Sequence, residues 1–420
     1  MKKILIILFI ALAGCIFASC EKDTNERVTG GKPEVSYVRA LSVEKPDNLV
    51  EGEFLGARLA IIGKGLAGVD RILFNDVPAV LNPAYVTETS IIVSIPSTIP
   101  GVKEDLLKLY TSEDSCIFNF EVKVPSPAIN SMKCEWLTPG NTAYISGQYF
   151  VDDPTSPLTV TFTGGAMGTI EEASLDHIAV KVPQGAQAGP VTVSSVYGTT
   201  KSPFWFRDNR NIILNFNNGE YPDYDYYFGW HGANGVSSEN GINGNYLILS
   251  GAEMTDATWN DGKFGYEVWT YLPTDPDFFD ASKIDNYVLK FECRVPAVWS
   301  AAALQIIFTG ASDVMLNWQN GNGLTFNSRW GSANGYLSDT GWPRILWNPW
   351  AATGSYQNNN WITVTIPMKE CKYSLNGGAA SINGAGHYSG ITLFVNGGGV
   401  AGTPCNPVIH IDNVRIVPAK

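Results

Sequence analysis

Tryptophan residues in polar loop segments are the part of this 420-residue sequence best suited to contacting a ligand. Trp259 directly precedes Asn260 and Asp261, so a flat ring stands beside an amide and a carboxylate. Such a ring can pack against the apolar C–H face of a pyranose, while neighbouring amides and carboxylates bind the sugar hydroxyls. We therefore predict a glycan-binding face, and its candidate residues are Trp259, Trp299, Trp330, Trp347, Trp350, Asn260 and Asp261.

Other tryptophans are expected to fill a hydrophobic core. Of the twelve in the chain, only Trp136 and Trp205 precede residue 207, so the composition changes sharply near that point. Trp269 and Trp361 lie in or beside segments where apolar and polar residues alternate, a pattern typical of a half-buried β-strand. We assign these two side chains to the core.

The sequence contains no catalytic signature. The nucleophile-elbow, zinc-protease and phosphate-loop motifs are missing, and His231, His387 and His410 are scattered along the chain. A glycosidase needs two carboxylates about 5–10 Å apart across the scissile bond, and no spacing selects a pair. We therefore predict a protein that is not an enzyme, with a glycoside hydrolase or lyase as the alternative. The candidate carboxylates of the last domain include Glu253, Asp256, Asp261, Glu267, Glu292 and Asp313.

Neither a metal site nor a disulfide framework is favoured. Residues 260–262 and 412–413 supply oxygen atoms that suit a structural calcium ion, but ordinary turns use the same residue types. No cofactor or metal is predicted. Beyond the N-terminal segment the cysteines are odd in number, with no C-x-x-C pair and no zinc-type spacing. One disulfide is the alternative, but mostly buried free thiols are the preferred interpretation. These cysteines are Cys116, Cys134, Cys293, Cys371 and Cys405.

The N-terminus has the organisation of a lipoprotein export signal. Two lysines precede an apolar run over residues 4–13, and small residues around two cysteines follow. This run is too short for an ordinary membrane span. Both Cys15 and Cys20 resemble a lipobox cysteine, and we favour Cys20 because a polar segment follows it at once. We predict a signal peptide over 1–20, lipidation of Cys20 and a polar tether over 21–32. A plain secretory signal is the alternative.

The acidic composition argues against nucleic acid as a partner. The formal net charge is −12 and the isoelectric point is about 4.9. Phosphate neutralisation requires clustered lysine and arginine residues, and the sequence contains no basic stripe. The chain is also long enough for several domains of about 100–200 residues each.

Two successive stretches, 33–125 and 126–206, show the same order of short β-branched runs separated by Gly, Pro and Asn. Residues 62–69 with 74–79 resemble the IPT/TIG family of immunoglobulin-like domains, and the second copy is a looser version of the same pattern. The resemblance implies two β-sandwiches.

Residues 63–68 also match the G-x-G-x-x-G string of dinucleotide-binding turns. A strand is expected to follow, where a nucleotide site would need a helix, so we exclude nucleotide binding.

The remainder, 207–420, is predicted to form one larger β-sandwich of the jelly-roll type. In the segment 289–295 the side chains of Leu289, Phe291, Cys293 and Val295 share one face, and the charged residues between them take the other. The fold class is therefore all-β. Further strands are expected at 304–308, 361–367, 390–395 and 408–417.

The combination of a lipid anchor, tandem IPT/TIG-like domains and a Trp-rich terminal sandwich resembles the surface glycan-binding proteins of Bacteroidetes polysaccharide-utilisation systems. Within the last domain the resemblance is carried by residues 211–219, 244–249, 360–367 and 410–417. It implies that Trp259 and Trp299 match tryptophans of the family's ligand platform. Xyloglucan binders have an aromatic pair at the second position, where this chain has Val298 and Trp299.

This resemblance implies a protein at the outer membrane, lipid-anchored and facing outward, that captures polysaccharide beside SusC-like and SusD-like partners. The two immunoglobulin-like domains would then act as spacers. We predict a plant β-glucan, either mixed-linkage glucan or xyloglucan, as the ligand, because flat, equatorially linked glucose suits a row of aromatic rings. A surface adhesin that binds protein remains a further alternative.

Overall fold

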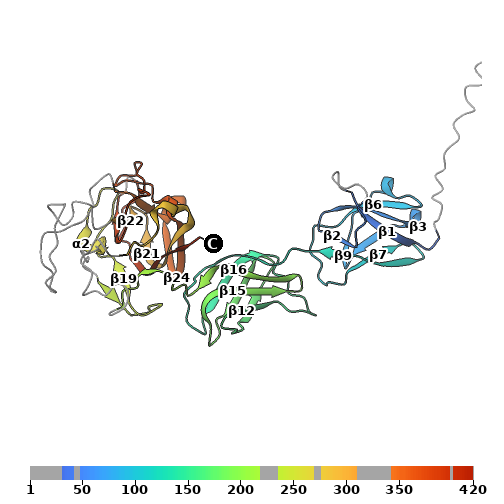
Figure 1. Ribbon diagram of the computed structural model, residues 1–420, viewed down its shortest axis with the longest axis horizontal. Helices are drawn as coiled ribbons and strands as arrows, with labels where there is room; N and C mark the ends of the chain where they lie inside the picture. Colours follow the sequence, from blue (N-terminus) through green and yellow to red (C-terminus); the bar gives the residue numbers. More distant parts are fainter. Residues whose placement is uncertain are drawn as a thin grey trace, which may run out of the picture. The chain divides into compact units, whose positions relative to one another are not determined.

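The computed structural model describes residues 31–41, 48–217, 235–268, 276–309, 342–397 and 401–419. The predicted signal peptide, Cys20 and most of the tether lie outside these residues. The regular secondary structure of the described chain is almost wholly β-strand, as the sequence predicts (Figure 1). Among the described helices, none is long and apolar enough to cross a membrane.

The first domain packs two antiparallel sheets and a short parallel pair around one core. Alternating positions fill that core, including Leu59 and Ile61 from one sheet and Leu107 and Leu109 from the other, each 0% exposed. The first sheet has the order β1 (Glu34–Ala40), β3 (Arg58–Lys64), β6 (Ser90–Ser94). The second has the order β5 (Val77–Pro78), β4 (Arg71–Phe74), β7 (Leu106–Tyr110), β8 (Ser115–Asn119), and β2 (Gly52–Phe54) pairs with β9 (Glu121–Lys123).

The glycine-rich string of this domain has a structural role. It leads through one short turn of 3-10 helix (Leu66–Gly68) into strand β4, as expected from the sequence. Gly65 adopts a φ of 66°, which favours glycine. A Cβ on Gly63 would lie 1.9 Å from the carbonyl oxygen of Glu34, so close backbone packing requires glycine here.

The second domain repeats the strand pairing of the first. Its strand β11 lies between β10 and β14, just as β3 lies between β1 and β6. The internal duplication inferred from the pattern is therefore also visible in the pairing order. One sheet has the order β10 (Ala128–Met132), β11 (Thr142–Gln148), β14 (His177–Lys181), β13 (Thr169–Ala173), and the other β12 (Thr159–Thr163), β15 (Gln187–Ser195), β16 (Gly198–Phe206).

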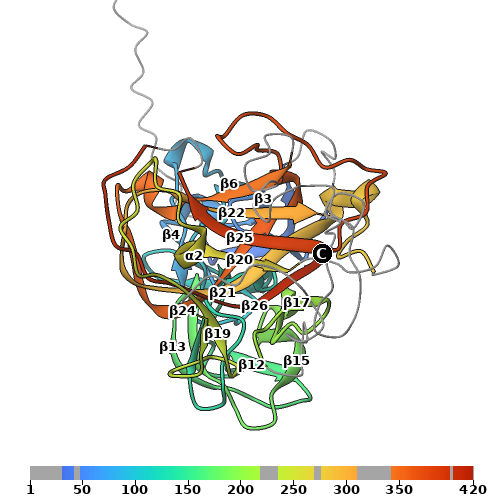
Figure 2. The same ribbon diagram turned by 90° about the vertical axis from the view of Figure 1, so that its left-hand side faces the viewer.

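The last domain is a sandwich of two sheets, seen as layers in Figure 2. Side chains from both sheets form its core, including Leu289 and Phe291 from one and Leu304 and Ile306 from the other. The larger sheet has the order β18 (Val236–Ser237), β19 (Tyr246–Leu249), β26 (Ile409–Pro418), β21 (Tyr287–Trp299), β24 (Tyr356–Pro367), and β17 (Ile212–Leu214) also pairs with β26. The smaller sheet has the order β20 (Gly265–Val268), β25 (Gly390–Asn396), β22 (Ala303–Thr309), β23 (Arg344–Trp347).

Strand β21 shows where the sequence pattern is right and where it is incomplete. Leu289, Phe291, Cys293 and Val295 are at most 1% exposed, as their shared face predicts. The charged positions between them do take the opposite face. However, Lys290 and Glu292 are only 6% and 0% exposed, so this part of that face is buried as well.

The chain divides into two compact units. One comprises residues 1–126 with 153–157, and the other residues 127–152 with 158–420. The second unit therefore joins the domain predicted at 126–206 to the domain predicted at 207–420, although the paired strands of each remain separate within the described residues. The role of these two domains as spacers stays a prediction.

All five cysteines beyond the N-terminal segment are free thiols. Cys134, Cys293, Cys371 and Cys405 are buried, in agreement with the preferred interpretation of the sequence. Burial raises the pKa of the Cys293 and Cys371 thiols far above its usual range, because a thiolate would be poorly solvated there. These cysteines pack as small apolar side chains.

Candidate functional site

Trp259 is a large, exposed aromatic side chain in a loop of the last domain. The loop lies between β19 and the short helix α2 (Asp261–Phe264), and the side chain is 42% exposed. One edge of the indole packs on Phe394 of β25, with ring centroids 4.9 Å apart and an interplanar angle of 64°. Trp259 is thus fixed by an edge contact while much of the ring remains accessible.

The loop that carries Trp259 is held in position by hydrogen bonds within the loop and by close packing against the end of β25. The hydroxyls of Thr255 and Thr258 lie 2.8 Å apart, and the Thr255 N–H donates to the Thr258 hydroxyl. A Cβ on Gly397, just after β25, would lie 1.9 Å from the carbonyl oxygen of Asp256. The close approach of these two segments positions the tryptophan.

Asn260 and Asp261 follow Trp259 and form the start of helix α2. The Asn260 carbonyl accepts the Phe264 N–H at 2.9 Å, and one Asp261 carboxylate oxygen accepts the Gly262 N–H at 2.9 Å. Both side chains are partly exposed. Among the residues that the structure describes, no cluster of three or more His, Cys, Asp or Glu side chains is arranged to hold a metal ion.

The sheet beneath Trp259 carries polar side chains on the face turned away from the core. In β25 the core positions Ile391, Leu393 and Val395 alternate with Thr392 and Phe394. Since successive residues of a strand point to opposite sides, Thr392 shares the side of Phe394. This face was not predicted from the sequence. A signal was available, because each of its polar residues alternates with core residues in a strand.

Register places four side chains in one row across this face. Glu267 of β20 pairs with Thr392, Thr392 pairs with Ile307 of β22, and Ile307 pairs with Arg344 of β23. Paired residues of adjacent strands point to the same side of a sheet. All four residues are buried. The row combines a carboxylate, a hydroxyl and a guanidinium beneath the Trp259 loop.

Arg344 is held in a fixed orientation within this row. Its guanidinium donates to the Gln305 side-chain oxygen at 2.7 Å and to the Trp342 carbonyl at 3.3 Å. The Gln305 amide in turn donates to the Leu375 carbonyl at 3.4 Å. Arg344 and Gln305 are both 0% exposed, so these bonds fix the two side chains within the sheet and stiffen the surface that supports Trp259.

Trp299 and Trp350 lie in the core, which corrects the prediction that they belong to a ligand face. Trp299 is 0% exposed and Trp350 is 5% exposed. Their indole N–H groups donate to the carbonyl oxygens of Ala301 and Ala302, at 2.6 and 2.7 Å. These carbonyls satisfy the polar edge of each ring, so both tryptophans can be buried without loss of a hydrogen bond.

Strand alternation explains which member of the pair at 298–299 reaches the surface. Trp299 points inward like Val295, whereas Val298 is 48% exposed. The exposed side chain at this position is therefore aliphatic in this chain. Trp347 is partly buried and packs edge-on against Trp299, with centroids 5.5 Å apart.

The remaining predicted tryptophans have different positions. Trp330 and Trp269 lie outside the described residues. Trp361, assigned to the core, is partly buried against a small apolar cluster that contains Cys134, Trp136 and Ile242. This cluster includes residues from both domains of the second unit.

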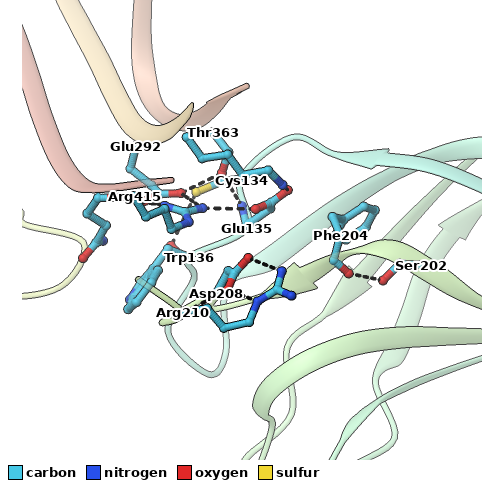
Figure 3. A network of polar contacts seen from close by, with 12 residues as sticks. Cys134, Glu135, Trp136, Ser202, Phe204, Asp208, Arg210, Glu292, Thr363 and Arg415 are labelled. Atoms are coloured by element: carbon cyan, nitrogen blue, oxygen red, sulfur yellow. Dashed lines mark hydrogen bonds and ion pairs between the residues drawn. The ribbon is translucent and has the colours of Figure 1, made fainter. Parts of the chain in front are cut away.

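The same junction contains a buried network of charges, shown in Figure 3. Glu135, which follows β10, binds the Lys290 ammonium at 2.6 Å and the Arg415 guanidinium at 3.1 Å. Arg415 also binds Glu292 through two contacts, of 2.8 and 3.0 Å. All four residues are at most 6% exposed, so the network pairs two buried carboxylates with two buried cations.

The electrostatics of this network follow from its burial. Burial raises the pKa of the Glu135 carboxyl above its usual value. The charges of Lys290 and Arg415 act in the opposite direction and reduce this shift. Burial alone would lower the pKa of Arg415, but the neighbouring Glu292 carboxylate reverses this, so the guanidinium stays charged. Glu292 was a candidate catalytic carboxylate, and its bonds to Arg415 and Thr363 assign it to this structural network.

The two described histidines of the last domain, His387 and His410, have no arrangement that suits a catalytic base. His387 is exposed and contacts Asp277 at 3.0 Å. Burial, helped by the Arg294 charge, lowers the pKa of His410 to about 4. Its Nδ1 accepts from the Arg294 guanidinium at 3.1 Å, so the ring serves as a neutral acceptor. His231 lies outside the described residues.

Comparison with known proteins agrees with this description. Residues 206–418 match the family model described as the surface glycan-binding protein B xyloglucan binding domain. The crystal structure of the surface glycan-binding protein PbSGBP-B from Prevotella bryantii is similar, with a TM-score of 0.77 and 29% identity over 94% of this chain and 100% of that chain. An IPT/TIG domain-containing protein from Bacteroides ovatus is 21% identical, covering 75% of this chain and 84% of that protein.

The matched family model covers the entire sandwich that carries Trp259 and its polar sheet face. Its relatives are surface proteins that bind glycans, so neither a hydrolase nor an adhesin is needed to explain this architecture. The chain belongs to the surface glycan-binding protein B family and is a non-catalytic, cell-surface polysaccharide-binding protein.

Proposed function

We propose that this protein captures a plant β-glucan, either mixed-linkage glucan or xyloglucan, for a polysaccharide uptake system. The observation that supports the proposal best is the exposed ring of Trp259, held against Phe394 beside a row of buried polar side chains. A glucan chain would stack one glucose face on this ring and bond its hydroxyls to neighbouring polar groups, including Asn260 and Asp261. Trp330 and Trp347 remain proposed contributors.

The choice between the two glucans depends on the surface around Trp259. The description of the matched domain names xyloglucan. The exposed aliphatic side chain of Val298 offers less flat surface than the aromatic residue expected in xyloglucan binders. A less substituted chain, such as mixed-linkage glucan, can be held with fewer stacked rings. Both ligands therefore belong in the test.

Calorimetric titration of residues 21–420 with barley β-glucan, xyloglucan, laminarin, xylan and mannan tests the proposal. We expect binding to barley β-glucan, xyloglucan or both. Chromatography of each incubated polysaccharide should show no shortened products, because the protein is not an enzyme. Binding only to xylan, mannan or laminarin would replace the proposed ligand, and silence across the panel would contradict capture of these glycans.

We further propose that Cys20 is lipidated and that the chain is anchored in the outer membrane, facing outward beside SusC-like and SusD-like partners. The apolar run over 4–13 and the polar segment after Cys20 support this anchor. Surface capture raises the local glycan concentration for neighbouring proteins.

Replacing Cys20 with alanine should abolish labelling by an alkyne fatty acid and release the protein from the membrane fraction. The reason is that acylation needs the cysteine thiol. Cys15→Ala is the matched control and should leave both labelling and membrane association unchanged. Labelling that persists in Cys20→Ala but disappears in Cys15→Ala would move the anchor to Cys15.

A further inference from the structure

A cavity lies at the junction of the two domains in the second compact unit. Its volume is about 390 Å³, within the range of about 300–1,000 Å³ typical of small-molecule sites. One wall comes from the β10–β11 region and includes Asn141 and Tyr144. The other comes from the last domain and includes Ile242, Asn360 and Trp361.

The two walls are fixed relative to each other by direct contacts. The Thr363 N–H donates to the Lys133 carbonyl at 2.9 Å, and the Glu135 N–H donates to the Thr363 hydroxyl at 2.7 Å. Lys133 itself lines the cavity, and Glu135 directly follows the lining residue Cys134. The buried bond from Glu135 to Arg415 reinforces these contacts (Figure 3). So does the bond from Glu135 to Lys290. The cavity is therefore preformed, and a ligand need not order it.

Two aromatic rings line the cavity from opposite domains. Tyr144 of β11 is 53% exposed, and the Lys133 ammonium lies 5.8 Å from its ring centroid. Trp361 of β24 is partly exposed, and its indole N–H donates to the Asn240 carbonyl at 3.2 Å. Arg294 lies over the Trp361 ring at 5.3 Å, which holds the indole in place.

The polar groups around these rings are mostly uncharged. Asn360 is exposed, and the Asn141 amide bonds to Thr138 at the rim. Lys133 is the one charged residue among the described lining residues. Amides and hydroxyls beside flat rings suit a neutral, hydroxyl-rich ligand with an apolar face. An anion or a wholly apolar ligand would match this lining less well.

We propose that this junction cavity is a second carbohydrate site, which takes one or two pyranose rings of a neutral glucan. Tyr144 and Trp361 contact the sugar faces, and the amides of Asn141 and Asn360 bind hydroxyls. The identity of the sugar as glucose rests on the proposed function of the Trp259 surface. The existence of the site rests on the cavity itself. The protein then contacts its polysaccharide at two separate places.

The experiment uses residues 21–420 labelled with 5-fluorotryptophan and titrated with cellotetraose, the backbone shared by the proposed ligands. Trp361→Phe and Trp259→Phe assign the two fluorine resonances. We expect the Trp361 resonance to shift on titration both in the wild type and in Trp259→Ala. Tyr144→Ala should weaken the apparent affinity reported by Trp361 on the order of tenfold and leave the Trp259 response unchanged.

Controls separate this inference from the function proposed for Trp259. Asn360→Ala, a second exposed change in the cavity, should act in the same direction as Tyr144→Ala. Tyr85→Ala removes a tyrosine 43% exposed in the first domain and should change neither response.

If the Trp361 resonance does not shift while the Trp259 resonance does, the cavity site alone is overturned. A Trp361 shift that disappears in Trp259→Ala, or that ignores Tyr144→Ala, also overturns it. Silence at both rings overturns both proposals for this sugar.

Discussion

Trp259→Ala is expected to abolish retention of the protein by its glucan while the fold stays intact. Truncation of an aromatic residue that anchors an interface typically costs about 2 kcal/mol or more, which weakens binding by about 30-fold or more. The fold should tolerate the change, because Trp259 is 42% exposed and meets Phe394 through an edge contact. We expect about 1 kcal/mol of lost stability from that contact.

Affinity electrophoresis in a gel that contains the glucan measures this effect directly. Tyr85→Ala is a well-matched control, since Tyr85 has nearly the same exposure, 43%, and lies in the first domain. It should migrate like the wild type. Trp259→Phe should retain part of the retardation, because a smaller flat ring remains. If Trp259→Ala unfolds the protein instead, Trp259 is a core residue and the proposed platform is wrong.

Glu135→Ala is expected to lower the free energy of unfolding of the second unit by about 3–5 kcal/mol, the usual cost of removing one partner from a buried ion pair. Lys290, which is 6% exposed, loses its carboxylate partner. Arg415 loses one partner but keeps Glu292. The dominant cost is therefore a buried ammonium group without a counter-charge.

Tryptophan fluorescence during chemical denaturation isolates this effect, since all twelve tryptophans lie in the second compact unit. Glu171→Ala is the matched control. Glu171 binds Lys181 at 3.0 Å in the same domain, but both side chains are over a third exposed. Exposed pairs contribute about 0–1 kcal/mol, so the control should change stability little.

A paired variant tests the physical reason for the expected loss. Glu135→Leu combined with Lys290→Met removes both charges and should recover much of the stability, because apolar residues can replace a buried ion pair. A loss under about 1 kcal/mol in Glu135→Ala would mean that water reaches the network. A double variant as unstable as Glu135→Ala would mean that lost packing, and not the unpaired charge, causes the effect.

Much of the fold could be predicted because strands follow a simple period. Alternation at 289–295 identifies the core face of β21, and four other predicted strands of the last domain occur as β22, β24, β25 and β26. The duplication of the first two domains was visible as a repeated order of short apolar runs. Each of these inferences depends on neighbours along the chain, which the sequence contains in full.

The roles of individual tryptophans were harder to predict, because composition does not reveal which way a ring points. Trp259 and Trp299 both looked like platform residues, yet one is 42% exposed and the other 0%. The carbonyls of Ala301 and Ala302 decide the positions of Trp299 and Trp350, since they satisfy the buried indole N–H groups. These two hydrogen bonds depend on the geometry of the turn at Ala301 and Ala302, which no local sequence pattern specifies.

An all-β, acidic chain with repeated sandwiches and an aromatic-rich last domain can be inferred from the amino-acid pattern alone. What lies against each strand face becomes clear only in the folded chain. The charged side of β21 looks solvent-facing in sequence, but Glu135, 155 residues away from Lys290, closes over it. Alternation along a strand fixes only the side on which a residue lies. Whether that side meets water, a ligand or another domain depends on contacts between residues distant in the chain.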